Sequence, residues 1–312
     1  MIDYTKIYLL NIDIDRLLKL SILDFKSTIS KNTGEINENH FVAEYNHCKI
    51  IIKIIKGENQ LERKYVIFSG SIHKMWNEIK GIKSPNYKVN KPYKGFNGNQ
   101  FTLNDLIEAR VHLEKLFECN ASQMLFKNVE FGINIILNFD PKFYLKGLLY
   151  HKNIFFDLSH RRNNAQAVHQ WFVFKIYNKS FQYNMSENVL RVELKIMKMI
   201  ELRSLGINTF SDINQDSLQK VCQLLLNRFD EIMHYDYTIK KSTLSQRERQ
   251  LVDRYSNPRY WLEELKSNHR DRHKKRLKEI TSRYSRNLHL QIRSGMIKRC
   301  VMLNQLSIIQ NV

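Results

Sequence analysis

The chain has 312 residues, with 50 Lys and Arg against 31 Asp and Glu, so its formal net charge is +19. This length allows one large domain or two modest ones with a real hydrophobic core. No apolar run approaches the roughly 20 residues needed to span a bilayer. The N-terminus carries acidic residues on both sides of a short apolar run, unlike a signal peptide. We therefore expect a cytoplasmic protein.

The positive charge is concentrated near the C-terminus. Residues 240–312 contain 18 Lys and Arg but 6 Asp and Glu, so this last quarter holds +12 of the +19. An excess of that size indicates a polyanionic partner, with nucleic acid as the first candidate. An anionic membrane surface is the alternative.

The four cysteines are widely scattered, at Cys48, Cys119, Cys222 and Cys300. None forms a C-x-x-C pair, and none stands at ligand spacing from a histidine. The sequence therefore supports neither a zinc site nor a disulfide framework. Buried, reduced thiols are expected.

The first 200 residues mix strand and helix patterns, which predicts an α+β region. A strand is expected at 4–12, and a hairpin at 42–68 turns at Gly57-Glu58-Asn59. A long loop rich in Gly, Pro and Asn follows at 81–99. Loops of this length are usually functional or mobile.

The middle of the chain continues this mixed pattern. Thr102 and Asp105 form a capping box that opens an amphipathic helix to about residue 119. A strand is expected at 129–138 and a short helix after Pro141. A connection containing Gly, His and Arg then leads to residue 171.

Two further strands are expected within residues 171–196, on either side of a polar turn from Gln182 to Asn188. Both alternate apolar and polar residues, as does the strand at 129–138. The apolar faces are formed by Val129, Phe131, Ile133, Ile135, Phe172, Phe174, Ile176, Leu190, Val192, Leu194 and Ile196. The opposite faces carry Glu130, Tyr177 and Glu193. We expect an antiparallel sheet with helices packed on one face and an exposed site on the other.

Beyond residue 213 the pattern is almost wholly helical. An amphipathic helix is expected at 217–234, and another begins at 258–266, where Tyr260 and Trp261 would pack it onto the rest of the domain. The basic stretch follows. The chain is therefore expected to divide into an α+β domain at 1–213 and a helical, basic region at 214–312.

Three segments, EFGINI (130–135), FKIYNKSFQY (174–183) and LRVELKI (190–196), together resemble rolling-circle replication initiators. The type is that of filamentous phages and of one large group of Gram-positive plasmids, and related phage-borne proteins of Bacteroidetes are similar. The resemblance covers roughly residues 65–215. It implies a nicking-joining endonuclease fold in the cytoplasm of a bacterial host.

In that family a strand tyrosine attacks the DNA backbone, forms a 5′-phosphotyrosyl link and frees a 3′-OH. The resemblance implies that Tyr177 is the nucleophile and that Glu130 and Glu193 hold Mg²⁺ or Mn²⁺. Asn178 stands where the plasmid enzymes usually have an aspartate; its amide oxygen would be a weaker metal ligand. The His-hydrophobe-His motif of other rolling-circle enzymes is absent from the sequence.

Attack by a tyrosine requires groups that stabilise its phenolate form. A free tyrosine has a pKa near 10, so forming the phenolate at pH 7 costs about 4 kcal/mol. Lys179 is expected on the same face as Tyr177, where it would lower the tyrosine pKa or hold a phosphate oxygen. Lys175 and Arg191 would act in the same way from neighbouring positions and contact DNA.

The C-terminal region supplies the expected DNA-binding surface. Six cations fall within nine residues: Arg270, Arg272, Lys274, Lys275, Arg276 and Lys278. Contacts to phosphates explain this cluster better than solubility does. The partners expected are origin DNA, single-stranded or supercoiled, and a host helicase or polymerase.

Other interpretations stay open. Tyr177 would be an ordinary strand aromatic in a non-catalytic DNA-binding regulator or a decayed initiator, which the change at Asn178 favours. A relaxase performs the same chemistry but uses a histidine triad. His73 and His151 are weak candidates for metal or DNA contacts, since a lone histidine is more often structural.

Overall fold

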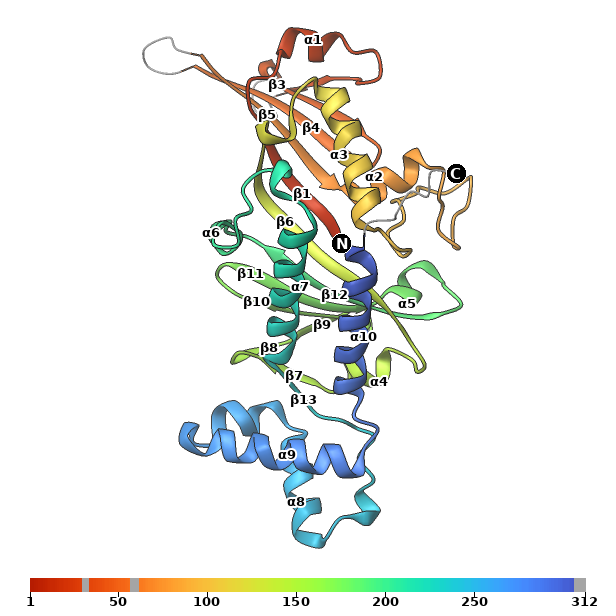
Figure 1. Cartoon of the computed structure of the whole chain (residues 1–312), viewed down its shortest axis with the longest axis vertical. Coiled ribbons are helices and arrows are strands. Elements are labelled where there is room, and N and C mark those ends of the chain that lie inside the picture. Colours follow the sequence, from red (N-terminus) through yellow and green to blue (C-terminus); the bar gives the residue numbers. More distant parts are fainter. Residues whose placement is uncertain (30–33, 57–61, 306–312) are drawn as a thin grey trace. The chain divides into compact units, whose positions relative to one another are not determined.

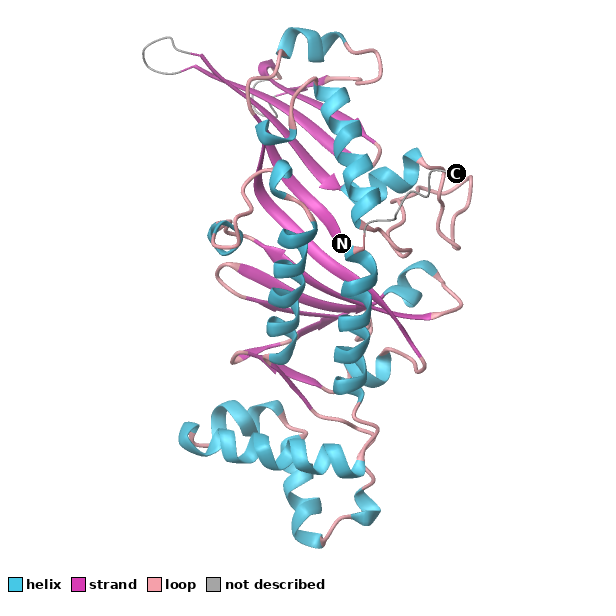
Figure 2. Cartoon of the chain, viewed as in Figure 1, coloured by secondary structure: helices cyan, strands magenta, loops and turns pink. Residues whose placement is uncertain are grey.

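The computed structural model describes residues 1–29, 34–56 and 62–305, and it is an α+β structure with antiparallel sheet and a helical C-terminal region (Figures 1 and 2). Contacts between Cα atoms divide it into two compact units. Unit 1 contains Met1–Gly132, Lys195–Cys222 and the chain from Val301; unit 2 contains Ile133–Leu194 and Gln223–Cys300. This division differs from the expected boundary at residue 213. The chain passes between the units within two strands and two helices, at residues 132–133, 194–195, 222–223 and 300–301, and local composition does not mark these positions.

Unit 1 is built on antiparallel strands in the order β2-β3-β4-β5-β1-β6. Their bounds are β1 (Ile2–Leu9), β2 (Lys26–Ile29), β3 (Ile36–Tyr45), β4 (Cys48–Lys56), β5 (Glu62–Ser71) and β6 (Met124–Leu137). β6 continues from unit 1 into unit 2. The strands expected at 4–12 and 129–138 are confirmed as β1 and β6.

The expected hairpin at 42–68 corresponds to two hairpins. β3 and β4 are joined at Asn46 and His47, whose φ angles of 44° and 67° provide the left-handed backbone that tight hairpin turns use. β4 then pairs with β5 from Cys48 opposite Gly70 to Lys56 opposite Glu62. The expected turn at Gly57-Glu58-Asn59 lies outside the described residues.

Unit 1 also contains helices α1 (Ile14–Lys19), α2 (Ile72–Ile79), α3 (Leu103–Phe117) and α6 (Ile200–Arg203). The capping box is confirmed: Asp105 accepts from the Thr102 backbone N–H at 2.8 Å, and Thr102 Oγ1 accepts from the Asp105 N–H. The Phe68 and Phe117 rings, 5.9 Å apart, pack α3 onto β5.

Unit 2 contains the end of β6 and then β12 (Asn188–Ile196, to Leu194 in this unit), β11 (Phe172–Asn178), β10 (Asn164–Val168) and β9 (Asp157–Ser159), in that order. A second sheet has the order β13-β7-β8, with β7 (Leu148–His151), β8 (Ile154–Phe155) and β13 (Ile232–His234). The connection expected before residue 171 contains strands β7 to β10, which the sequence did not predict. These strands are too short to show a clear alternation.

One face of the unit 2 sheet is covered by the unit 2 parts of two helices, α7 (Gln215–Asp230, from Gln223 in this unit) and α10 (Leu288–Asn304, to Cys300 in this unit) (Figure 1). A Cβ added at Gly295 of α10 would lie 2.8 Å from the Ile135 side chain of β6, so helix and strand are in close contact. Arg293 joins the two helices by donating to the Asp230 carboxylate at 2.7 and 2.8 Å. The expected apolar strand faces are confirmed as buried. The short helices α4 (Lys142–Leu145) and α5 (Lys179–Tyr183) also belong to this unit.

Between β13 and α10, unit 2 contains helices α8 (Gln246–Tyr255) and α9 (Arg270–Tyr284) and the π-helix η4 (Tyr260–Glu264). Tyr260 and Trp261 are buried here as expected, and the Trp261 indole donates to the Tyr255 carbonyl at 2.9 Å. The helix expected at 217–234 is shorter, because α7 ends at Asp230 and β13 then pairs with β7.

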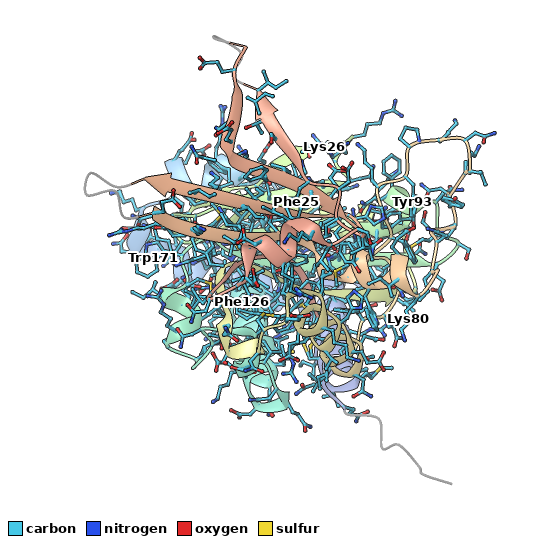
Figure 3. All side chains as sticks on the ribbon, turned by 90° about the horizontal axis from the view of Figure 1, so that it is seen from above. Phe25, Lys26, Lys80, Tyr93, Phe126 and Trp171 are labelled. Atoms are coloured by element: carbon cyan, nitrogen blue, oxygen red, sulfur yellow. The ribbon has the colours of Figure 1, made fainter. Side chains whose placement is uncertain are left out.

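Apolar side chains are buried in both units, and Figure 3 draws all the described side chains on the ribbon. In unit 1, for example, Phe126 packs against Phe210 at a ring distance of 5.4 Å, whereas Trp171 at the start of β11 is exposed in unit 2. The four cysteines are buried and free, as expected. Within the described ranges, no helix combines the length and apolar character needed to cross a membrane.

Candidate active site

Tyr177 of β11 and Glu193 of β12 are joined by a hydrogen bond in unit 2. The Tyr177 hydroxyl donates to Glu193 Oε2 at 2.7 Å. Arg191, two residues before Glu193 on the same strand, donates from Nε to the same oxygen at 3.1 Å. β11 and β12 are neighbours in the sheet, and side chains two residues apart on a strand share a face. The predicted nucleophile and one predicted carboxylate therefore meet.

The site surface that the sequence predicted as exposed is largely buried, and of the site residues predicted there only Tyr177 and Lys175 are partly exposed. Arg191 and Glu193 are each only 2% exposed, and Glu130 is 7% exposed. Alternation predicts which residues share a face, but not whether solvent reaches that face. Burial of these charges is compensated by pairing, since Arg191 also donates to Asn134 Oδ1 at 3.1 Å. The polar face is an interior charged cluster.

Lys179 reaches Tyr177 by a route that differs from the prediction. It was expected on the strand face beside Tyr177, but β11 ends at Asn178 and Lys179 begins α5. Its ammonium group lies 4.9 Å from the centre of the Tyr177 ring and 5.0 Å from that of Tyr183, and it donates to Gln182 Oε1 at 3.1 Å. The side chain is 1% exposed. A buried cation therefore contacts the predicted nucleophile.

Lys175 lies on the rim of this cluster. Its ammonium group is 3.9 Å from Glu193 Oε1, a long ion-pair distance, and its side chain is partly exposed. Tyr177 is also only partly buried. Lys175, Lys179 and Arg191 thus surround the Tyr177–Glu193 pair with positive charge, which suits an anionic phosphate.

Asn178 has a structural role at the end of β11. Its Oδ1 accepts from the Phe181 backbone N–H at 3.0 Å and so caps α5, while its Nδ2 donates to Asn163 Oδ1 at 3.3 Å. This is the direction that strand alternation predicts, away from Tyr177. A metal-ligand role for Asn178 stays a prediction.

Glu130 lies in unit 1 and has its own partner there. Its Oε1 is 3.2 Å from the Lys195 ammonium group, which also lies 5.2 Å from the centre of the Tyr4 ring. The pKa of Tyr4 is raised, mainly by burial and in smaller part by the Glu130 charge. Glu130 is therefore one member of an ion pair.

Each predicted metal ligand has hydrogen-bond or ion-pair partners from the protein itself. Their oxygens accept from Arg191 and Tyr177 at Glu193, from a backbone N–H at Asn178, and from Lys195 at Glu130. Among residues 1–29, 34–56 and 62–305, no three His, Cys, Asp or Glu side chains gather as a metal site would require. We derive no catalytic step through a metal. Dependence on Mg²⁺ or Mn²⁺ stays a prediction.

The histidines named from the sequence have structural contacts. His73 is 2% exposed; its Nε2 lies 2.8 Å from Asn99 Oδ1 and its ring stacks on Phe101. His151 is fully buried, with Nδ1 2.8 Å from His169 Nε2 and Nε2 2.8 Å from the Arg228 carbonyl oxygen. Burial lowers the pKa of His151 to about 4.

Five of the six predicted DNA-binding cations of α9 are exposed: Arg272, Lys274, Lys275, Arg276 and Lys278. Arg270 is less exposed and donates to the Leu262 carbonyl at 3.0 Å, so it helps to fix the start of the helix. Two residues of these clusters were not among the predicted site residues: Asn134, which accepts from Arg191, and Arg247, which faces α9 from α8. Asn134 could have been found from its place on the predicted polar face of β6.

Comparisons with protein-family models, curated proteins and solved structures found no match for this chain.

Proposed function

We propose that this protein is a rolling-circle replication initiator that nicks and rejoins one DNA strand through a tyrosine nucleophile. The observation that carries the proposal is the 2.7 Å hydrogen bond from Tyr177 to Glu193, with the Lys179 ammonium group beside the tyrosine ring. A positioned hydroxyl, a carboxylate that accepts its proton, and surrounding cations are the groups required for attack on a phosphodiester.

The proposed step is a transesterification. The Tyr177 oxygen attacks the phosphorus atom, and its proton passes to Glu193. A bond forms between the tyrosine oxygen and phosphorus, while the bond from phosphorus to the 3′ oxygen breaks. The leaving oxygen takes up a proton and becomes a 3′-OH, and the 5′ phosphate stays attached to the tyrosine. Attack by a 3′-OH on this link reverses the step and rejoins the strand.

The cations around Tyr177 and Glu193 have different roles in the proposed reaction. Lys179 stabilises the negative charge that develops on the Tyr177 oxygen, because it is buried and close to the ring. Lys175, at the partly exposed rim, holds a phosphate oxygen. Arg191 holds Glu193 in the orientation that accepts the proton. The exposed cations of α9 bind origin DNA, and a host helicase or polymerase is the further partner expected.

A nicking assay tests the proposal. A supercoiled plasmid carrying the DNA that flanks the gene would be incubated with wild type, Tyr177→Phe or Tyr183→Phe. Tyr183 is a matched control, since its ring also lies beside Lys179. We expect relaxed circles with wild type and Tyr183→Phe, and none with Tyr177→Phe. Equal nicking by all three proteins would refute the tyrosine assignment.

The second candidate is a non-catalytic DNA-binding regulator. It is favoured by the Arg191–Glu193 ion pair, because a carboxylate held by a guanidinium group is a weaker proton acceptor. If this function holds, wild type and Tyr177→Phe bind the same DNA equally and neither nicks it.

A further inference from the structure

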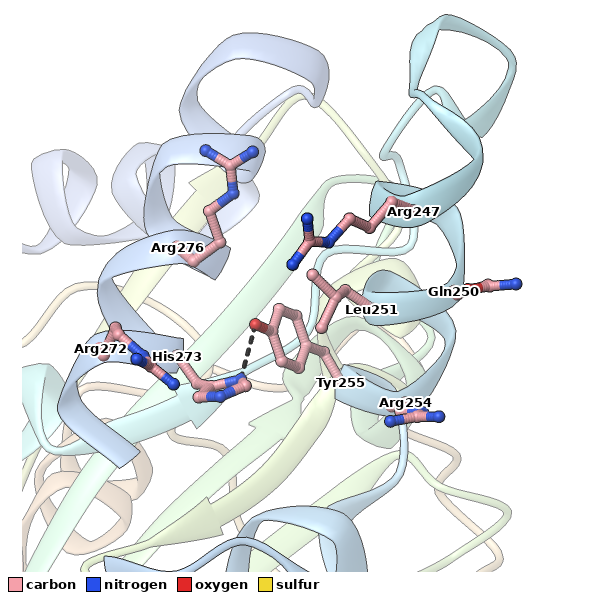
Figure 4. A pocket seen from close by; sticks show the side chains of 8 residues that line it. All are labelled: Arg247, Gln250, Leu251, Arg254, Tyr255, Arg272, His273 and Arg276. Atoms are coloured by element: carbon pink, nitrogen blue, oxygen red, sulfur yellow. Dashed lines mark hydrogen bonds between the residues drawn. The ribbon is translucent and has the colours of Figure 1, made fainter. Parts of the chain in front are cut away.

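A surface pocket of about 530 Å³ lies between α8 and α9 in unit 2 (Figure 4). Four of its eight lining residues are arginines, and none is acidic: Arg247, Gln250, Leu251, Arg254, Tyr255, Arg272, His273 and Arg276. Figure 4 shows Arg247, Leu251 and Tyr255 of α8 facing His273 and Arg276 of α9. The first three stand four residues apart, which places them on one face of the helix.

The arginines of the pocket differ in how they are held. Arg276 donates to Glu248 Oε1 at 2.7 Å and to Glu279 Oε2 at 3.4 Å, so its guanidinium group is fixed at the rim. Within the described part of the chain, Arg247, Arg254 and Arg272 are not within ion-pair distance of any carboxylate. Clustered arginines without a carboxylate partner in their own chain attract an anion with several acceptor oxygens.

His273 is held in the pocket by two tyrosines. Its Nδ1 lies 2.9 Å from the Tyr255 hydroxyl and 3.5 Å from the Tyr260 hydroxyl. An imidazole can donate a hydrogen bond to a phosphate oxygen through a protonated ring nitrogen. Tyr255 is itself buried, and its backbone carbonyl accepts a hydrogen bond from the Trp261 indole of η4. This contact fixes Tyr255 at the base of the pocket.

We propose that this pocket is a phosphate-binding site in which Arg247, Arg272, His273 and Arg276 hold a phosphoryl group. Planar guanidinium groups match the paired oxygens of a phosphate, and a phosphodiester or terminal phosphate fits a pocket of this size. The expected source is the DNA backbone, and in this respect the inference rests on the proposed function. A free nucleotide carries the same group.

Arg247→Gln is the informative variant, because Arg247 has no ion pair among the described residues and its loss should leave the fold intact. Arg259→Gln is the matched control, since Arg259 is exposed and lies outside the pocket. The probes are a fluorescein-labelled single-stranded oligonucleotide, read by anisotropy, and pyrophosphate, read by calorimetry. A polyglutamate peptide serves as the non-phosphate anion, and thermal unfolding checks that each variant is folded.

We expect Arg247→Gln to weaken binding of both the oligonucleotide and pyrophosphate roughly tenfold, as loss of a charged hydrogen bond does. The slope of log binding constant against log salt concentration for the oligonucleotide should fall by about one, the amount expected for loss of one phosphate contact. Arg259→Gln should bind as wild type.

If all three proteins bind DNA equally, the pocket assignment is wrong and the nicking proposal is unaffected. If no form binds DNA but Arg247→Gln loses pyrophosphate, the phosphate site stands with a free nucleotide as its source, and the proposed function fails. Loss of polyglutamate binding alone would overturn the phosphate assignment in favour of an acidic peptide.

Discussion

The hydroxyl of Tyr177 donates a 2.7 Å hydrogen bond to Glu193, and the two residues come from neighbouring strands 16 positions apart in sequence. Glu193 is almost fully buried, whereas Tyr177 is partly exposed. The carboxylate is therefore enclosed, whereas part of the tyrosine reaches the surface. In the proposed reaction this hydrogen bond is the route by which the Tyr177 proton passes to Glu193.

Replacement of Glu193 by Gln separates the proton-acceptor role from packing. Glu193→Gln keeps the shape of the side chain but removes the charge that accepts the Tyr177 proton. We expect the single-turnover nicking rate to fall on the order of 100-fold or more. Loss of the partner of buried Arg191 should also destabilise the fold by about 3 kcal/mol, measured by urea unfolding. Glu187→Gln, a substitution at an exposed position between β11 and β12, is the control and should alter neither the nicking rate nor the stability. An unchanged nicking rate in Glu193→Gln would contradict the role of the carboxylate.

Lys179→Met tests whether the buried cation assists the tyrosine. Methionine fills similar space, but it cannot stabilise negative charge on the Tyr177 oxygen. Nicking should therefore need a higher pH, and the pH–rate profile should move about one unit in the alkaline direction. Lys198→Met, at an exposed position after β12, is the control. A lower rate with no movement of the profile would indicate that Lys179 acts through packing alone.

The buried histidines of unit 2 should make stability fall in acid. Burial lowers the pKa of His151 to about 4, whereas the unfolded chain has the ordinary value near 6.5. The unfolded state therefore binds the extra proton first as pH falls. The contribution of His151 is complete above pH 6.5 and is lost between about 6.5 and 4, by about 3 kcal/mol at most.

Urea unfolding between pH 7 and pH 4 measures this loss. His234 and His289 should add to it, because burial lowers their pKa values to about 4 and about 3. His151→Asn should reduce the pH dependence by up to one proton, while the same change at exposed His160 should leave it as in wild type. An equal slope in wild type and His151→Asn would contradict the assignment.

Gly295→Ala tests the packing of α10 on β6. Alanine favours a helix by about 1 kcal/mol over glycine, but its Cβ would lie 2.8 Å from the Ile135 side chain. Overpacking of this kind usually costs about 1–3 kcal/mol, so we expect a net loss of stability. Ser294→Ala on the exposed side of the same helix should be close to neutral. A more stable Gly295→Ala protein would show that the helix is free to move away from the strand.

Local patterns predicted the parts of the fold that depend on local physics. Alternation located β6, β11 and β12 and their apolar faces, and the Thr102–Asp105 box marked the start of α3. The short strands β7 to β10 were missed because two to five residues carry too little periodicity. The division into units was also beyond prediction, since it depends on contacts between distant segments.

The candidate site was predicted in part. Strand pairing placed Tyr177 beside Glu193, as the shared face suggested. Sequence alone could not show that Glu193 is buried, or that β11 ends one residue before Lys179. It also could not show that α8 contributes Arg247 to a pocket with α9, because that depends on how two helices pack.

The most direct test of the account is the identity of the residue that becomes attached to DNA. Wild type would be incubated with the supercoiled plasmid, the DNA-linked protein digested with protease, and the nucleotide-bearing peptide sequenced by mass spectrometry. We expect a peptide modified at Tyr177 and joined to a 5′ phosphate. A link at another residue, or nicked DNA with no attached peptide, would contradict it.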